Sequence, residues 1–440
     1  MKDWNWFQLG VVAFFLFLLM AGIAVFATYG GKSSQEVGPV SIWGTFDRSA
    51  METVIVELAG TDDAFQNVSY VQKSPDTYRQ ELTEAIARGA APDIAMLDDS
   101  DVVSFVAKID QIPYSTMSQR AFNDAFIDEA GIFAGTQGII GLPLFIDPLV
   151  MYWNRDLFAG AGLATYPKTW TELQSIAPRM TSLDGTSNVK RSAVAIGTYS
   201  NVRHSKEILS ALLMQAGDQI VLRGDDGTLS SVFGANNTQS VENPAEAVLR
   251  FYTNFANPSQ TAYSWNRALP DSFTAFSSGD VGVYFGFASE YRPITTRNPN
   301  LAVGVATLPQ TAASRSPLTY GKMTALVIPR GARNSAGGMA VAQKLTNTDA
   351  VTIITAKTGL PPVRRDVLSA NSAAADSVGS VFAQSALISR SWYDPSPQQT
   401  SDIFRNMVES VISGREQLSS AIRSAQLSLN DIFDKLHLPQ

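Results

Sequence analysis

Short apolar runs alternate with amphipathic segments over most of this chain, and that alternation limits the folds that it can adopt. Three segments have the length and composition of buried strands, namely residues 40–43 (VSIW), 68–71 and 93–97. Between them, residues 49–58 have helical spacing, and a serine–proline pair at 74–75 marks the start of a second helix. Strands that alternate with helices of this length predict an open α/β sheet.

An uninterrupted apolar segment precedes the alternating region. Residues 9–27 contain no charged side chain, and a helix of that length measures about 28 Å, close to the roughly 30 Å hydrocarbon core of a bilayer. We therefore predict a transmembrane anchor over residues 9–29, preceded by a cytoplasmic stub over 1–8 and followed by a tether over 30–38. Small residues just before position 28 leave a cleavable signal sequence open as the alternative. We expect a single-pass protein of the cell membrane, with the large domain on the extracytoplasmic side.

The composition argues against several classes of protein. The chain has 440 residues and a formal net charge of −7, and no run of Lys or Arg is longer than the pair Arg364 and Arg365. A nucleic-acid partner is therefore not expected, because it would need a clustered basic surface. The absence of cysteine excludes disulfides, thiolate metal sites and a cysteine nucleophile. We predict no cofactor and no metal.

Polar and aromatic side chains follow two of the predicted strands. Trp43 and Asp47 come at and after the end of the first strand, and Asp98 begins an acidic stretch after the third. Open α/β sheets bind ligands beyond the carboxyl ends of their strands, where carboxylates accept hydrogen bonds from hydroxyl groups and aromatic faces pack on sugar rings. This combination indicates a neutral polyol ligand. The alternative is that the aspartates cap helices and the tryptophan belongs to the core.

The most specific pattern in the chain lies at residues 138–173, GIIGLPLFIDPLVMYWNRDLFAGAGLATYPKTWTEL. This stretch resembles the extracellular solute-binding proteins of ABC importers, in the family that includes the maltose- and maltodextrin-binding proteins (family 1). Members of that family carry a G-x-P-x-x-x-[DE]-x-x-x-x-Y-N-K-D-x-F signature followed by P-K-T-W-x-E-L. Here Trp153 and Arg155 replace the usual tyrosine and lysine. Thr169 and Glu172 also have the spacing of a capping box, which predicts the start of a helix.

Further segments resemble the same family in the same order. They include residues 208–217, 273–284, 325–329 and 359–365. In the second of these, Gly282 stands where the family usually has alanine. The resemblance covers nearly the whole chain after the tether. It implies a type II periplasmic-binding-protein-like fold, in which two α/β lobes close over a ligand in a hinged cleft.

The resemblance also implies how the chain divides. Lobe one is expected over residues 39–146 and 307–345, and lobe two over residues 147–306 and 346–440. Three segments should cross between the lobes, and we expect them near residues 143–150, 303–309 and 344–346.

Seven residues correspond to ligand-contacting positions of the family. Trp43, Asp47 and Asp98 match loops of the first lobe, and Asp147 matches an acidic position on the first crossing segment. In the second lobe the resemblance implies Asn201, Glu290 and Tyr291. The chain lacks the tryptophan that maltodextrin-binding members have near the last of these loops.

The function that this resemblance implies is that of a substrate-binding receptor. It would act as a monomer without enzymatic activity, capture a mono- or oligosaccharide, and deliver it to a membrane permease with a separate ATPase. A sugar-binding protein that feeds a sensor or chemoreceptor is the second interpretation. The third is a glycosidase that uses two carboxylates such as Asp98 and Asp147, since the chain has neither a G-x-S-x-G nor an H-E-x-x-H motif for other hydrolytic chemistry.

Overall fold

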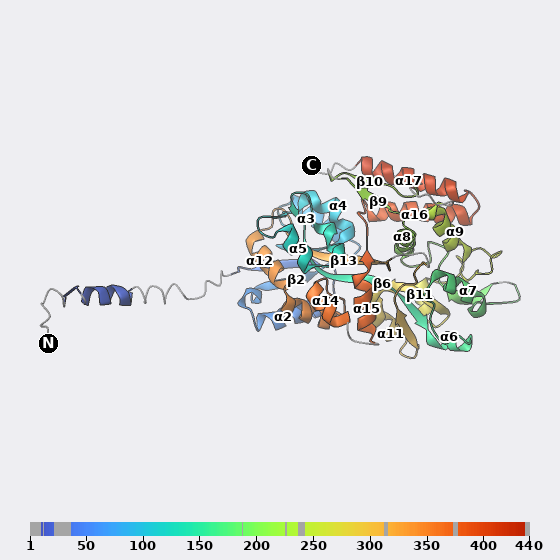
Figure 1. The fold of residues 1–440 in the computed structure, drawn as a ribbon, viewed down its shortest axis with the longest axis horizontal. Coiled ribbons are helices and arrows are strands. Elements are labelled where there is room, and N and C mark those ends of the chain that lie inside the picture. Colours follow the sequence, from blue (N-terminus) through green and yellow to red (C-terminus); the bar gives the residue numbers. More distant parts are fainter. Residues whose placement is uncertain are drawn as a thin grey trace.

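The computed structural model of this protein describes residues 10–11, 13–21, 37–186, 188–224, 227–235, 243–311, 316–372 and 377–435. From residue 37 onward these residues form two α/β lobes that lie side by side, with helices around a central sheet (Figure 1). The predicted two-lobed α/β fold is therefore confirmed.

One sheet of ten strands runs through both lobes. In spatial order its main path is β2 (Val68–Gln72), β1 (Val40–Gly44), β3 (Ile94–Asp98), β13 (Thr319–Val327), β6 (Leu142–Asn154), β11 (Val281–Phe287), β8 (Val189–Val194) and β7 (Ser182–Leu183). To these are added β12 (Val303–Ala306), paired with β6, and β14 (Ser389–Arg390), paired with β13. Two small ladders lie apart from the sheet, β4 (Ile112–Pro113) with β5 (Gly138–Ile139) and β9 (Val221–Arg223) with β10 (Leu229–Ser231). The three strands predicted first are β1, β2 and β3, and β1 pairs in parallel with both of the others.

The helices of lobe one lie on both sides of its part of the sheet. They are α2 (Arg48–Ala59), α3 (Tyr78–Ala87), α4 (Val102–Phe105), α5 (Gln119–Ala125), α12 (Ser335–Leu345), α13 (Thr348–Thr358) and α14 (Arg365–Ser372), with short 3₁₀ turns at Asp63–Phe65, Asp99–Asp101, Val106–Lys108 and Asp128–Phe133. Local sequence explains where they begin: the Asp47 carboxylate caps α2 by accepting a 2.9 Å hydrogen bond from the Ala50 amide.

Lobe two carries a second set of helices. They are α6 (Arg155–Gly160), α7 (Trp170–Met180), α8 (Ser205–Gln215), α9 (Pro244–Asn254), α10 (Ser272–Ser277), α11 (Tyr291–Arg297), α16 (Pro397–Ile412) and α17 (Leu418–Asp434), with a 3₁₀ turn at Ala288–Glu290 and with α15 (Val378–Leu387) between the lobes. The predicted capping box is present at the start of α7, where Thr169 and Glu172 each bond to the other's backbone amide.

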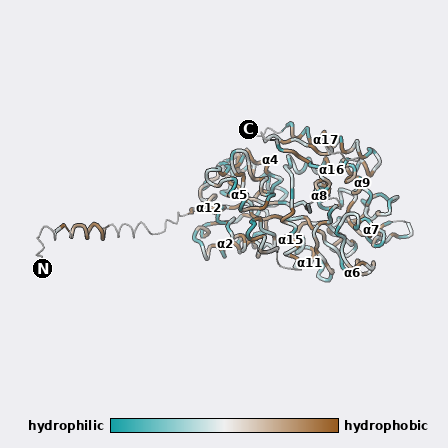
Figure 2. The backbone as a smooth tube through the Cα atoms, viewed as in Figure 1, coloured by the Kyte–Doolittle hydropathy of each residue, from teal (hydrophilic) through white to brown (hydrophobic). Residues whose placement is uncertain are grey.

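Two separate hydrophobic cores correspond to the two lobes, and β6 and β13 belong to both. On β6, residues up to Ile146 pack in the first core and residues from Leu149 onward pack in the second. On β13, Tyr320 packs in the second core and Met323 in the first. The two strands are antiparallel neighbours, and Figure 2 shows apolar residues along this central part of the molecule. A pair of hydrogen-bonded strands therefore connects the lobes.

The cores divide the chain differently from the lobe boundaries that the resemblance implies. The segment 303–309 does not cross, because Ala306 and Leu308 both pack in the second core, and β13 crosses instead. The segment 344–346 does not cross either, since Leu345 and residues of α13 pack in the first core. The first core continues through Leu368 and also includes Ala383 and Ala386 of α15. Crossing depends on strand pairing between distant parts of the chain, which local patterns do not reveal.

The amino-terminal prediction falls mostly outside the described residues. Residues 10–11 and 13–21 are helical and apolar (Figure 2), whereas residues 1–8, the remainder of the predicted anchor over 9–29 and most of the tether lie outside the described part. Within the described ranges, none of the helices combines the length and the apolar character that a bilayer span requires.

Gly282 on β11, where the family usually has alanine, gives a first prediction. A Cβ atom at this position would lie 2.8 Å from the backbone oxygen of Ala193 on the neighbouring strand, and would also meet the Met180 side chain. We expect Gly282→Ala to lower the free energy of unfolding by about 1–3 kcal/mol, because the strand backbone cannot move away cheaply. Urea titration of the variant measures this loss.

The matched control is Gly160→Ala at the end of α6, where nothing lies within 4 Å of an added Cβ. This substitution should be neutral or slightly stabilising, because alanine favours helix. Equal effects at positions 282 and 160 would contradict the packing argument.

Candidate functional site

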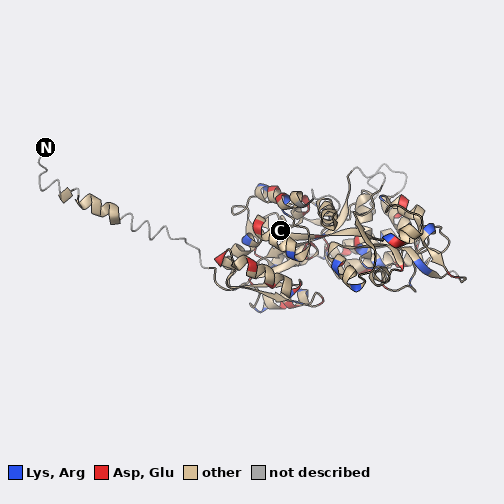
Figure 3. Cartoon of the chain, turned by 90° about the horizontal axis from the view of Figure 1, so that it is seen from below, with Lys and Arg blue, Asp and Glu red and all other residues tan. Residues whose placement is uncertain are grey.

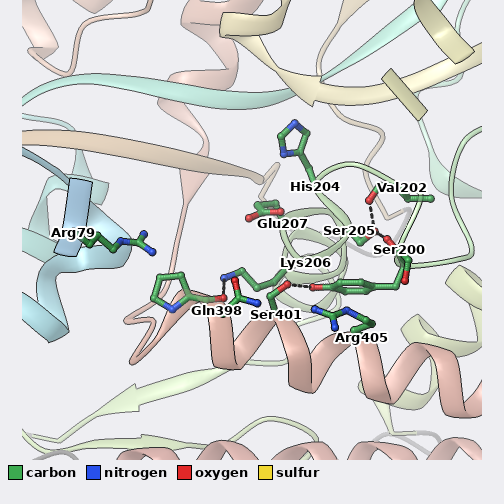
Figure 4. A pocket seen from close by; sticks show the side chains of 12 residues that line it. Arg79, Ser200, Val202, His204, Ser205, Lys206, Glu207, Gln398, Ser401 and Arg405 are labelled. Carbon is green, nitrogen blue, oxygen red and sulfur yellow. Dashed lines mark hydrogen bonds between the residues drawn. The ribbon is translucent and has the colours of Figure 1, made fainter. Parts of the chain in front are cut away.

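A cavity of about 640 Å³ lies between the two lobes. Its lining comes from the loop before α8 and the first turn of that helix, from the first turns of α16, and from α3 of lobe one, which contributes Arg79 (Figure 4). Two of the lining segments, those at α8 and α3, follow the carboxyl ends of β8 and β2. This is the location at which open α/β sheets bind their ligands.

Charged groups face this cavity from both lobes. Each cation among them has a carboxylate partner: Arg79 pairs with Asp101, Lys206 with Asp394 and Arg405 with Asp402. Glu207 lines the same cavity, and no hydrogen bond or ion pair joins its carboxylate to another described residue. The cavity wall thus offers hydrogen-bond donors on its cations and a free hydrogen-bond acceptor on Glu207. Figure 3 shows that acidic and basic residues are otherwise distributed along both lobes.

His204 precedes α8 in a backbone conformation that is rare for a residue with a side chain. Its φ is 61°, and no other non-glycine residue in the described ranges has a positive φ. The ring packs edge-on against Phe287 at 4.7 Å, and Nε2 lies 3.1 Å from a carboxylate oxygen of Glu290. A left-handed residue of this kind costs on the order of 1–2 kcal/mol, so these side-chain contacts help to hold the turn that presents the start of α8 to the cavity.

Lys322 lies on β13, at the point where the chain passes between the cores. Its backbone is in register with Asp147 on β6, and its Nζ lies 3.7 Å from the Asp98 carboxylate. The charges of Asp98 and, after it, Asp147 and Glu207 raise the pKa of Lys322, which overcomes the effect of burial. Lys322 therefore remains charged, and its side chain is still 42% exposed.

The structure brings two of the sequence-predicted carboxylates to Lys322. Asp98 ends β3 and accepts a 2.7 Å hydrogen bond from the Thr324 hydroxyl. Asp147 is buried on β6 and accepts a 3.0 Å hydrogen bond from the Ser289 amide. Burial raises the pKa of Asp147 to about 6, so this group is mostly ionised at neutral pH.

Glu290 is held in a network of lobe two. Although burial alone would raise its pKa, hydrogen bonds from His204 and Tyr284 and the charge of Arg203 keep the pKa of Glu290 below its usual value. The Tyr284 hydroxyl donates at 2.7 Å to Oε2. Tyr291, the next residue, packs against the second core with its ring 6.2 Å from that of Phe382.

The three remaining predicted residues have structural contacts. Trp43 is half-buried, and Lys73 Nζ lies 3.8 Å from its ring centroid. Asp47 is exposed and caps α2. The Asn201 amide donates to the backbone oxygens of Asn266 and Leu269 at 2.9 and 3.0 Å, which uses both of its N–H groups.

None of the seven predicted residues lines the cavity of Figure 4. Glu290 contacts the lining residue His204, whereas Asp98 and Asp147 act on Lys322. Sequence reasoning missed Arg79, Glu207 and Lys322. For Lys322 a signal was present, namely one lysine within the apolar run 319–327. For Arg79 and Glu207 there was none, because each resembles an ordinary exposed charge on a helix.

Comparison with known proteins identifies the family. The sequence profile of the bacterial extracellular solute-binding proteins matches residues 60–378. The chain belongs to this family of extracellular solute-binding proteins. Over 436 residues it is also 22% identical to a protein of Brucella abortus (strain 2308) that is named as a binding protein, a match that covers 95% of this chain and 98% of the relative.

Solved structures of solute-binding proteins share the fold. One is an ABC transporter solute-binding protein from Thermotoga lettingae TMO bound with α-D-tagatose, with a TM-score of 0.70 and 22% identity over 90% of this chain and 100% of the other. Another is a cyclo/maltodextrin-binding protein complexed with maltotetraose, with a TM-score of 0.74 and 16% identity over 92% of this chain and 100% of the other. At these identities the likeness establishes the two-lobed architecture.

Proposed function

We propose that this solute-binding protein is the receptor of an ABC importer and that a mono- or oligosaccharide binds between its lobes. The observation that carries the proposal is a cavity of about 640 Å³ whose walls come from two separate cores joined by β6 and β13. Such walls can close on a solute as rigid bodies while the connecting strands bend. The sugars bound by the two structural relatives support a carbohydrate ligand.

The polar groups around the cleft suit hydroxyl groups, which both donate and accept. Arg79, Arg405 and Lys322 offer N–H donors, and Glu207 and Asp98 offer carboxylate oxygens. The proposed contacts also include the sequence-predicted Asp147 and Glu290. Because both lobes contribute, a sugar that contacts both favours the closed form over the open form.

The closed form then provides the signal to a membrane permease with a separate ATPase subunit. We propose that the apolar segment at residues 9–29 holds the protein at the membrane and that the lobes lie on the extracytoplasmic side. We further propose that the protein acts as a monomer and releases its solute unchanged.

A thermal-shift screen of the full chain in detergent tests this function. The panel contains mono- and oligosaccharides, polyamines and divalent cations, and each ligand is recovered and analysed after incubation. A sugar at a hundred times its dissociation constant should add about 2.7 kcal/mol to the stability of the fold. Stabilisation by a sugar that is recovered intact supports the proposal.

Three results would count against it. Recovery of a cleaved or modified sugar would indicate an enzyme. Stabilisation by polyamines or cations alone would overturn the carbohydrate ligand. A panel that produces no shift would contradict the proposal as a whole.

A further inference from the structure

Arg79 and Glu207 face the same cavity from opposite lobes. Arg79 is the second residue of α3 in lobe one, and Glu207 is in the first turn of α8 in lobe two. Figure 4 shows both side chains directed toward the space between the lobes, with no dashed line at Glu207. Arg79 is the single lining residue of this cavity that belongs to lobe one.

Both side chains keep unused hydrogen-bonding capacity. Arg79 contacts Asp101 through Nε, and within the described residues no partner faces its two terminal nitrogens, which carry four more N–H donors. The Arg79 side chain is 47% exposed. The Glu207 carboxylate has no counter-charge within hydrogen-bond distance among the described residues. One opposite charge is therefore available on each wall.

We propose that Arg79 and Glu207 form a salt bridge across the cleft when the lobes close, and that this pair stabilises the closed form before any solute binds. The pair connects two bodies that otherwise move about β6 and β13. Closing would bring the guanidinium plane to the carboxylate, a geometry that allows two parallel N–H···O bonds. This ion pair would act on the motion of the lobes, whichever solute binds in the cleft.

Other cations near Glu207 are poorer partners for this closing contact. Arg405 and Lys206 belong to the same lobe as Glu207, and each has its own carboxylate, so closing would not change their distance to it. The charge of Glu207 contributes to the raised pKa of Lys322, but the carboxylates that affect Lys322 more are Asp98 at the end of β3 and Asp147 on β6. Among the residues that line this cavity, Arg79 is the one that belongs to the other lobe.

Distance measurements between two spin labels test the proposal without any ligand. Because the chain has no cysteine, the exposed residues Ala107 of lobe one and Gln399 of lobe two can be replaced by cysteine and labelled in the full protein. The ligand-free protein should show a short-distance and a long-distance population. In the Glu207→Gln variant the ratio of the short-distance to the long-distance population should fall about two- to fivefold, as expected for one partly exposed ion pair.

Further variants assign the effect to this pair. Arg79→Gln should also lower the ratio, and adding Glu207→Gln to it should lower the ratio no further. High salt should weaken the wild-type short population. The control is Arg405→Gln, which removes a cation of the same cavity within lobe two and should leave the ratio unchanged.

Arg79→Gln also leaves Asp101 without its cation, so Glu207→Gln is the decisive variant. An unchanged distance distribution in Glu207→Gln would overturn the proposal. A ratio that falls in Lys322→Met and not in Arg79→Gln would also overturn it, because the partner of Glu207 would then be Lys322.

Discussion

The variant Lys206→Met should lose about 3–5 kcal/mol of unfolding free energy, because it breaks a buried ion pair. Lys206 is the second residue of α8, and its Nζ lies 2.7 Å from the carboxylate of Asp394, a residue that is 3% exposed. The same Nζ also reaches the Pro397 oxygen and the Thr400 hydroxyl, both at 3.3 Å. Removing the ammonium would leave a buried carboxylate with no counter-charge. Urea titration measures the loss.

Two companion variants define the cause. In Lys206→Met combined with Asp394→Asn, the buried negative charge is gone, so the double variant should be more stable than Lys206→Met alone. The matched control is Lys435→Met, which removes a lysine from an exposed pair with Asp431 whose side chains are 71% and 63% exposed. That change should stay within about 0.5 kcal/mol. A similar loss in both lysine variants would contradict the argument from burial.

The second large effect is a dependence of stability on pH that centres on Glu129. This glutamate is 8% exposed and accepts a 2.7 Å hydrogen bond from the Ser391 amide as well as one from the Ser391 hydroxyl. Burial raises the pKa of Glu129 to about 7. Asp99 lies in the same buried cluster. One of its carboxylate oxygens has no hydrogen-bond partner among the described residues, and burial raises its pKa as well.

The direction of the effect follows from these raised values. A carboxyl group whose pKa is higher in the folded than in the unfolded state favours folding while it is protonated. Its contribution is lost as the pH rises from the unfolded value of 4.5 through about 7. For Glu129 this loss amounts to about 3 kcal/mol at alkaline pH.

Glu129→Gln should remove this part of the pH dependence, because the amide oxygen can still accept from Ser391 and never ionises. We expect the variant to be more stable than the wild type at pH 8 and close to it at pH 4.5, as measured by urea titration at both values. The control is Glu84→Gln, at a half-exposed glutamate, which should leave the dependence of the unfolding free energy on pH unchanged. If the free energy of unfolding of Glu129→Gln changed with pH as it does in the wild type, the ionisation of Glu129 would cost the fold little.

Local patterns predicted the elements of this fold well. The strand at 40–43, the helix that contains Tyr78 and Leu82, and the capping box at Thr169 each depend on a few neighbouring residues. The crossing on β13 was not predicted. It depends on the pairing of Met323 with Ile146, residues far apart in the chain whose meeting no local pattern indicates.

The candidate site was only partly predictable for a related reason. Asp147 was predicted because it lies within a family pattern, and in the structure it is in register with Lys322 on the neighbouring strand. Asn201 was predicted in the loop before α8, and its amide donates both of its N–H groups to backbone oxygens of the same lobe. Whether a polar group is free or occupied depends on tertiary contacts, so the unused carboxylate of Glu207 could not be separated from other surface charges.

The two strands shared by both cores have a consequence for how the chain is made. β3 has its partner β13 more than two hundred residues later, so the sheet of lobe one keeps an open edge until most of the protein has been synthesised. Lobe two in turn needs α16 and α17, at the end of the chain, to cover its core. Neither lobe can be completed during early translation, and open edges invite aggregation. Both lobes can therefore be completed only after the last helices have been synthesised.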